Sequence, residues 1–91
     1  MSGASDPLLD AVRGIVERVA GQSRVPARVD ESTRLADGFW LDSGDLLNVI
    51  LECEREFGIA FDDTQDFGRG AFETLGTLAA LVRAKRGKAL P

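Results

Sequence analysis

Histidine and tyrosine are absent from the sequence, and cysteine occurs once, at Cys53. A single cysteine excludes an internal disulfide and a cysteine-rich metal site. Without histidine, and with carboxylates whose positions suggest exposure to solvent, the sequence contains no recognisable acid–base or nucleophilic constellation. We therefore expect no catalytic residue, no metal site and no enzyme activity. Cys53 lies on the apolar side of a predicted helix, which indicates a buried and unreactive thiol.

Long apolar runs and an excess of positive charge are missing as well. The longest apolar stretch is far too short to cross a bilayer, and no segment resembles a signal peptide, so we expect a cytoplasmic protein. The net charge is −4 and the isoelectric point is near 4.7. Nucleic acids and anionic membranes repel an acidic surface, so neither is an expected partner, whereas proteins with basic patches are.

The apolar residues that are present recur mainly at helical spacing. One such pattern starts at Pro7, a favoured first helical residue, and stops at Gly21. A second covers residues 43–57. A third lies near the C-terminal end, with Thr74 or Thr77 as its start. The 91 residues are enough for one small domain, so these three helices must share a single core.

The stretch from residue 22 to residue 41 lacks periodicity, and we expect a long loop there, pinned to the core by Leu35 and Phe39. Residues 71–75 are expected to form a short helical turn. We therefore predict an all-α fold, a small bundle of three main helices plus one short helix, with a long loop between helices one and two. The expected divisions are a disordered N-terminus (1–6), the domain (7–86) and a C-terminal tail (87–91).

The predicted helix at residues 43–57 has more apolar surface than one packing face requires. At roughly 100° per residue, its core stripe comprises Leu46, Val49, Ile50, Cys53 and Phe57. The residues on the opposite side, expected to face water, are Asp45, Asn48, Glu52, Arg55 and Glu56. Leu47 and Leu51 form a shoulder beside the core stripe, on the flank of Ser43. Periodicity alone leaves open whether they widen the core or remain exposed.

Ser43 has two possible roles at the start of this helix. Asp42 and Ser43 are both good N-cap residues, and Asp45, three residues after Asp42, resembles the second half of a capping box. A helix start also favours an anion, because free N–H groups and the macrodipole point there. A phosphate ester on Ser43 would be well placed, but the residues alone do not decide between a cap and a modified serine.

The spacing of several motifs resembles the acyl carrier protein family. The motifs are Leu41-Asp42-Ser43, then Leu46, Leu47 and Ile50, and then Glu54-Arg55-Glu56-Phe57-Gly58-Ile59. In that family an Asp-Ser-Leu motif opens the second helix, and a Glu-Glu-x-Phe-Gly-Ile-like sequence closes it. The serine carries a 4′-phosphopantetheine arm that comes from coenzyme A. The similarity extends upstream to Leu35 and downstream to the segment from Phe72 to Leu78, so it covers most of the chain.

The resemblance implies an acyl-carrier-like bundle with Ser43 as the attachment site and Asp42 as its support. The implied docking residues are Gly44, Asp45, Leu47, Asn48, Leu51 and Glu52. The implied partners are a phosphopantetheinyl transferase and acyl-loading and acyl-processing enzymes with basic patches, and we expect a monomer. Residues 42–63 hold seven acidic residues and one basic residue. Such a charge run can be a solvated face, but its position beside the shoulder favours docking.

Three features depart from the family pattern. Gly44 replaces the usual Leu or Met after the serine, and Asp66–Gly70 lengthen the loop before the third helix. Trp40 stands where fatty-acid carriers usually have a small residue. An exposed aromatic beside the attachment site is one interpretation of Trp40, but we expect a buried loop anchor, because aromatics contribute so much buried area in small domains.

These departures favour a carrier of polyketide or related secondary-metabolite (antibiotic) biosynthesis over one of fatty acid biosynthesis. The cargo would be an acyl intermediate held as a thioester on the arm. Leu41-Asp42-Ser43 and Phe72-Glu73-Thr74-Leu75 are also similar to D-alanyl and aminoacyl carrier proteins, which is the first alternative. The second alternative is a helical interaction domain of the same fold in which Ser43 is not modified.

Overall fold

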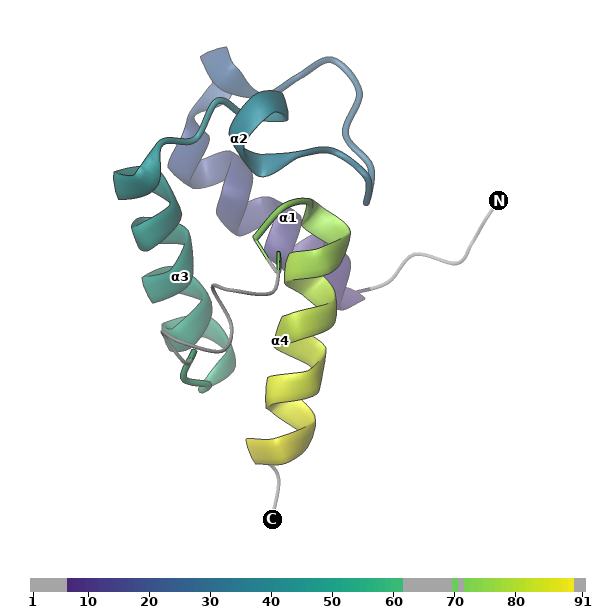
Figure 1. Cartoon of the computed structure of the whole chain (residues 1–91), viewed down its shortest axis with the longest axis vertical. Coiled ribbons are helices and arrows are strands. Elements are labelled where there is room, and N and C mark those ends of the chain that lie inside the picture. The colour runs from purple at the N-terminus through teal and green to yellow at the C-terminus, as the bar shows by residue number, and fades with distance from the viewer. Residues whose placement is uncertain (1–6, 62–69, 71, 90–91) are drawn as a thin grey trace.

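The computed structural model describes residues 7–61, 70 and 72–89, and these form a helical bundle (Figure 1). The elements are α1 (Pro7–Ala20), the 3-10 helix η1 (Gln22–Arg24), α2 (Leu35–Gly38), α3 (Ser43–Phe57) and α4 (Leu75–Ala89). Within these ranges there is no strand, and one isolated antiparallel bridge joins Arg34 to Thr74. The predicted all-α fold, with three main helices and one short one, is confirmed.

Helix α1 begins and ends as its sequence predicts. Pro7 is its first residue, where the fixed φ of proline suits a helix and its missing N–H costs no hydrogen bond. Gly21 follows the last residue with a φ of 83°, and its N–H donates to the carbonyl of Glu17 at 2.9 Å. Residues with a side chain rarely adopt that backbone conformation, so a glycine ends α1 here.

Helix α4 begins directly after Thr74, one of the two predicted starts. The Thr74 hydroxyl accepts from the N–H of Thr77 at 3.1 Å, and the Thr77 hydroxyl accepts from the N–H of Thr74 at 2.9 Å. This reciprocal pair satisfies two N–H groups at the helix start. The helix continues to Ala89, so residues 87–89, assigned to the C-terminal tail, are helical.

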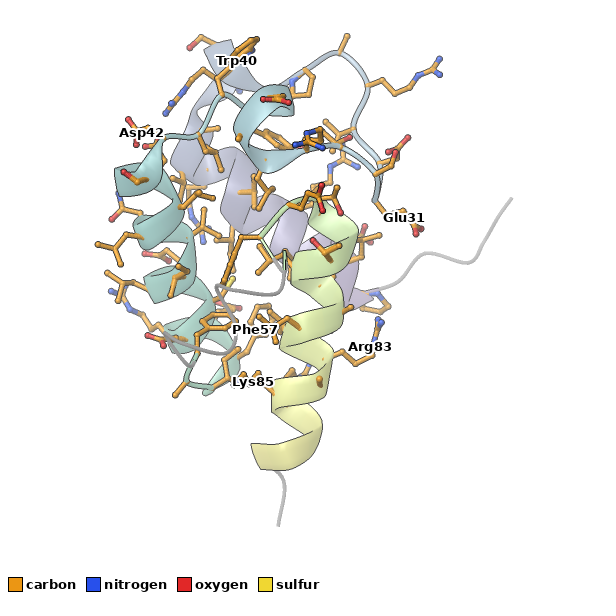
Figure 2. All side chains as sticks on the ribbon, in the orientation of Figure 1. Glu31, Trp40, Asp42, Phe57, Arg83 and Lys85 are labelled. Atoms are coloured by element: carbon orange, nitrogen blue, oxygen red, sulfur yellow. The ribbon has the colours of Figure 1, made fainter. Side chains whose placement is uncertain are left out.

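The core lies between the three long helices, with α1 packed against both α3 and α4. Helix α1 contributes Leu8, Val12, Ile15, Val16 and Ala20. Helix α3 contributes Val49, Ile50 and Cys53, and α4 contributes Leu75, Leu78, Ala79 and Val82. At the far end of α3 the ring of Phe57 lies 5.8 Å from the guanidinium carbon of Arg86, a cation–π contact between α3 and α4. Figure 2 shows Phe57 between these two helices.

The short helix was predicted in the wrong place. Residue 71 lies outside the described residues. Residues 72 and 73 form a turn and a bend, and Thr74 forms the bridge to Arg34, whereas residues 35–38 form α2 within the long loop. Leu35 and Phe39, at either end of α2, are buried as predicted. Backbone hydrogen bonds explain the short helix: the N–H groups of Gly38 and Phe39 both donate to the carbonyl of Arg34. The buried side chains of Leu35 and Phe39 anchor α2 to the core, and local periodicity does not reveal such tertiary packing.

Candidate functional site

The first turn of α3 carries an exposed serine next to a completed capping box. Ser43 is the first helical residue, and Asp42 is the N-cap. The Asp42 carboxylate accepts from the N–H of Asp45 at 2.8 Å, and the Asp45 carboxylate accepts from the N–H of Asp42 at 3.2 Å. The predicted capping box is confirmed. With Asp42 and Asp45 forming the cap, Ser43 is not the capping residue.

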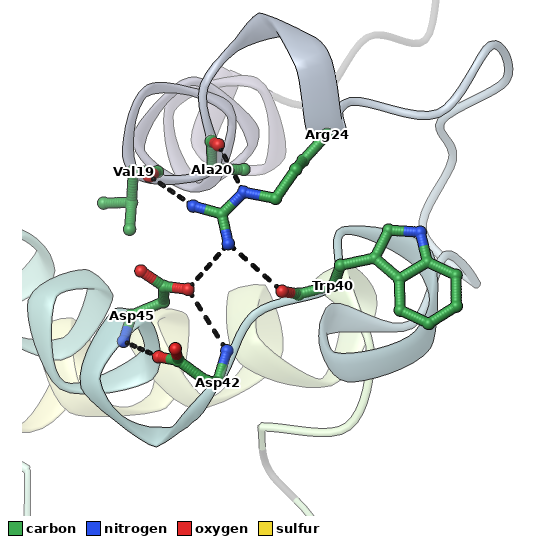
Figure 3. A network of polar contacts seen from close by, with 6 residues as sticks. All are labelled: Val19, Ala20, Arg24, Trp40, Asp42 and Asp45. Atoms are coloured by element: carbon green, nitrogen blue, oxygen red, sulfur yellow. Dashed lines mark hydrogen bonds and ion pairs between the residues drawn. The ribbon is translucent and has the colours of Figure 1, made fainter.

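A second network fixes this turn to α1 (Figure 3). The Arg24 guanidinium donates to the Asp45 carboxylate at 2.8 Å and to the Trp40 carbonyl at 3.2 Å. It also donates to the carbonyls of Ala20 at 2.7 Å and Val19 at 3.4 Å, at the end of α1. Cations suit a helix C-terminus, because its last carbonyls lack partners within the helix. Arg24 therefore joins the end of α1 to the start of α3.

The Arg24 network corrects the predicted position of Asp45. We expected Asp45 to face water, but its side chain is largely covered by the contacts with Arg24 and Asp42. Two hydrogen bonds hold the pKa of the Asp45 carboxyl below its usual value. The bond from the Arg24 guanidinium has the larger effect, and the bond from the Asp42 N–H has the next largest. Asp45 is therefore ionised and neutralised by Arg24, so the negative charge beside Ser43 is smaller than the sequence suggests.

The role of Arg24 could not be predicted from the sequence. Its partner Asp45 is 21 positions away along the chain, and no periodic pattern links the two residues. A single arginine in an aperiodic loop gives no signal that it will cross to a helix start. The only available indication was its position just after Gly21, where a cation can reach the carbonyls at the end of α1.

The shoulder of α3 is exposed, which answers the question that periodicity left open. Leu47 is 55% exposed and Leu51 is 49% exposed, whereas Val49 and Cys53 are completely buried. Burial raises the pKa of the Cys53 thiol to about 12, with smaller contributions from the neighbouring glutamates. The predicted buried and unreactive thiol is therefore supported by the structure. Leu47 and Leu51 are two of three large apolar side chains exposed within the described residues.

A shallow apolar pocket adjoins the serine. Its volume is about 480 Å³, and its lining residues are Ser43, Gly44, Leu46, Leu47 and Ile50. Leu46, placed on the core stripe by its angle, is half-buried: it packs against the core and also lines this pocket. The pocket thus connects the serine to the apolar shoulder on one face of α3.

Trp40 is the third exposed apolar residue, and its predicted role as a buried anchor is wrong. Its side chain is 68% exposed, whereas the neighbouring Phe39 is completely buried. Phe39 occupies the anchoring position instead. Trp40 has a positive φ of 58°, and its exposure shows that its side chain is directed away from the core. Figure 2 places Trp40 and Asp42 at the same end of the molecule.

The other predicted docking residues differ in how available they are. Gly44 and Asn48 are exposed. Glu52 is partly covered and forms ion pairs with Arg18 and Arg55, each at 3.6 Å. Both acidic docking candidates, Asp45 and Glu52, are thus already paired within the domain. The lengthening of the loop by residues 66–70, predicted from the sequence, lies outside the described residues except for Gly70.

The part of the chain that the structure describes contains neither a metal-ligand cluster nor a candidate membrane-spanning helix. No cluster of three or more potential metal ligands occurs among those residues. None of the described helices is both long enough and apolar enough to span a membrane.

Comparisons with known proteins identify the family. The model of the family described as "phosphopantetheine attachment site" matches residues 10–84, which include most of α1, all of α3 and most of α4. A comparison with curated proteins gives no match.

Proposed function

Because the chain belongs to the family of carrier proteins with a phosphopantetheine attachment site, we propose that Ser43 carries the arm. Members of this family hold a covalently attached 4′-phosphopantetheine and are non-catalytic carriers of acyl groups. Carrier proteins generally interact with a phosphopantetheinyl transferase and with acyl-processing enzymes. The proposals for this chain concern which residue bears the arm and which cargo the arm carries.

One observation carries the assignment to Ser43: an exposed hydroxyl at the first residue of a capped helix, beside an apolar pocket. Exposure allows an enzyme to reach the hydroxyl oxygen. The positive end of the α3 macrodipole favours the phosphodiester that results. Arg24 neutralises Asp45, which reduces the repulsion between that phosphodiester and the acidic cap.

The attachment is a phosphoryl transfer from coenzyme A to the serine. The Ser43 oxygen forms a bond to the phosphorus that bears the pantetheine group, and the bond from that phosphorus to the nucleotide breaks. The 3′,5′-adenosine diphosphate leaves, and the hydroxyl proton passes to a base of the transferase. This chain supplies only the positioned hydroxyl, so its contribution is to hold α3 rigidly and to present its first turn.

We further propose that the cargo is an acyl intermediate of polyketide or related secondary metabolism. Gly44 and Trp40, two of the three departures from the family pattern, both lie exposed around Ser43, where a partner enzyme would meet them. A carrier that served fatty-acid enzymes would be expected to keep the usual residues there. Loading assays on the arm-bearing protein with acyl and aminoacyl donors distinguish this proposal from an aminoacyl carrier.

Intact mass spectrometry tests the assignment to Ser43. The protein is incubated with coenzyme A and a broadly specific phosphopantetheinyl transferase. We expect one phosphopantetheinyl group on the native chain and none on Ser43→Ala. The matched control is Ser23→Ala, an exposed serine in η1, which should still gain one group. A group that persists on Ser43→Ala would overturn the assignment, and no addition to any variant would favour an unmodified interaction domain.

A further inference from the structure

Trp40 combines two features that are unfavourable for the stability of the folded domain. Among the described residues it is the one non-glycine residue with a positive φ, 58°. That region is strained for a bulky side chain, because its Cβ approaches the backbone. The indole is also 68% exposed, so it gains little from burial in return. A strained residue that contributes little to the core is a candidate for a role outside it.

The neighbouring residues hold Trp40 in this position from both sides. Phe39 and Leu41 are buried, and the N–H of Leu41 donates to the carbonyl of Leu35 at 3.2 Å. The Arg24 guanidinium holds the Trp40 carbonyl at 3.2 Å. With both neighbours fixed and its carbonyl turned to Arg24, the indole must point outward. Figure 3 shows the ring directed away from the Arg24 network.

We propose that Trp40 is a recognition residue for the enzyme that transfers the arm, and that its indole inserts into an apolar recess of that enzyme. This inference rests on the proposed attachment at Ser43. Trp40 lies three residues before Ser43 and is tied through Arg24 to the capping residue Asp45. An enzyme that brings coenzyme A to the serine oxygen must cover this surface. Tryptophan is among the residues that contribute most when buried at an interface.

The charges around Trp40 indicate the border of that recess. Arg24, whose guanidinium holds the Trp40 carbonyl, is itself paired with Asp45 within the domain. Asp42 is exposed and has no ion pair among the described residues. Asp42 thus places an unpaired acid two positions from the exposed indole, so the partner that fits is an apolar recess bordered by lysine or arginine.

The chain has a single tryptophan, which makes a direct test possible. Incorporation of 5-fluorotryptophan gives one fluorine resonance that reports on position 40 alone. We expect this resonance to shift or broaden when the unlabelled transferase is added, and to stay unchanged when the isolated protein acquires its arm. An unchanged resonance with saturating transferase would overturn the proposal. So would a shift caused by the arm alone, because the indole would then contact the arm of its own chain.

Kinetics of arm transfer separate recognition from a structural role. Trp40→Gly should raise the KM for the carrier about tenfold or more with little change in kcat, because an interface contact is lost. The same variant should raise the melting temperature, since glycine tolerates a positive φ. Trp40→Phe should recover part of the KM, and Trp40→Asn, which also tolerates this backbone, should not.

Each alternative outcome has a distinct meaning in this experiment. A structural anchor at position 40 would give a lower melting temperature for Trp40→Gly and an unchanged KM, which contradicts the proposal. Equal KM values for all variants, with normal modification of Ser43, would likewise overturn it and leave the attachment site intact. Failure to modify Ser43 in the native chain would instead refute the proposed function itself.

Discussion

Helix α3 carries two apolar rows that differ in burial although their residues are of the same kind. Val49 and Cys53 are completely buried against the bundle. Leu47 and Leu51, only two positions away in each case, are about half exposed. The exposed row continues back to Gly44 at helical spacing and ends beside Ser43. The comparison shows that α3 has one face for folding and a second apolar face that folding does not need.

Substitution by glutamate should separate the two rows most strongly. Val49→Glu places a carboxylate in the core, at a cost of several kcal/mol against a total stability of about 5–15 kcal/mol. We expect it to unfold the domain. Leu47→Glu should cost about 1 kcal/mol or less, as is usual for surface positions. It should nevertheless slow arm transfer, because it puts charge on the proposed docking face.

Thermal melting and the rate of arm transfer, measured on both variants, decide this comparison. If Leu47→Glu melted as early as Val49→Glu, Leu47 would belong to the core and the docking face would lie elsewhere. If Leu47→Glu melted normally and accepted the arm at the native rate, the exposed row would have no part in docking.

Cys53 reports on the buried row without any mutation. Burial raises its pKa from 9.0 to about 12, so near pH 8 the reactive thiolate should be about a thousandfold less abundant than in the unfolded chain. We expect thiol reagents to label it very slowly in the native protein and rapidly in denaturant. Rapid labelling of the native protein would mean that α3 is rotated, with the two rows exchanged.

Arg24 fixes the start of both rows by holding α3 against the end of α1. Arg24→Gln should lower the melting temperature at pH 7, because the Asp45 carboxylate loses its ionic partner. The pKa of Asp45 is lowered in the folded state, so this stabilisation is fully present above the ordinary value of 3.8. It is lost as the pH falls through the lower folded value.

The melting temperatures of the native chain and of Arg24→Gln, measured from pH 7 down to pH 3, test this dependence. The difference between them should stay constant down to about pH 4 and then narrow. A difference that is the same at every pH would show that Arg24 acts through the carbonyls of α1 rather than through Asp45.

Gly44 extends the exposed row and should give the smallest effect. In a helix, alanine is more stable than glycine by up to about 1 kcal/mol. A Cβ at position 44 would meet only the Asp42 carboxylate oxygen, at 3.4 Å, a contact that a small shift relieves. We expect Gly44→Ala to stabilise the domain slightly, as measured by denaturant unfolding. A loss of stability would mean that the capping box needs glycine there.

Local signals in the sequence predicted most of the fold. The start of α1 at Pro7, its end at Gly21, the capping box of α3 and the start of α4 at Thr74 all follow from residues close in the chain. Gly58 ends α3 in the left-handed conformation, with a φ of 65°. Each of these features depends on residues that are close together in the chain, so the sequence alone predicts it.

The parts that the sequence did not predict depend on long-range contacts. The short helix α2, the buried pairing of Asp45 with Arg24 and the outward orientation of Trp40 all arise from packing around residues 19–45. For the adjacent aromatics Phe39 and Trp40, composition suggested burial for both. Only the backbone conformation at residue 40 determines which of the two enters the core.

Peptide mapping tests the central claim, attachment of the arm at Ser43, most directly. Trypsin cleaves after Arg34 and Arg55, and the resulting peptide of residues 35–55 contains Ser43 as its only hydroxyl-bearing residue. After treatment with coenzyme A and transferase, fragmentation of this peptide should place a single phosphopantetheinyl group on Ser43, with Cys53 unmodified. A group found on a peptide that contains another serine, with residues 35–55 unmodified, would contradict the claim.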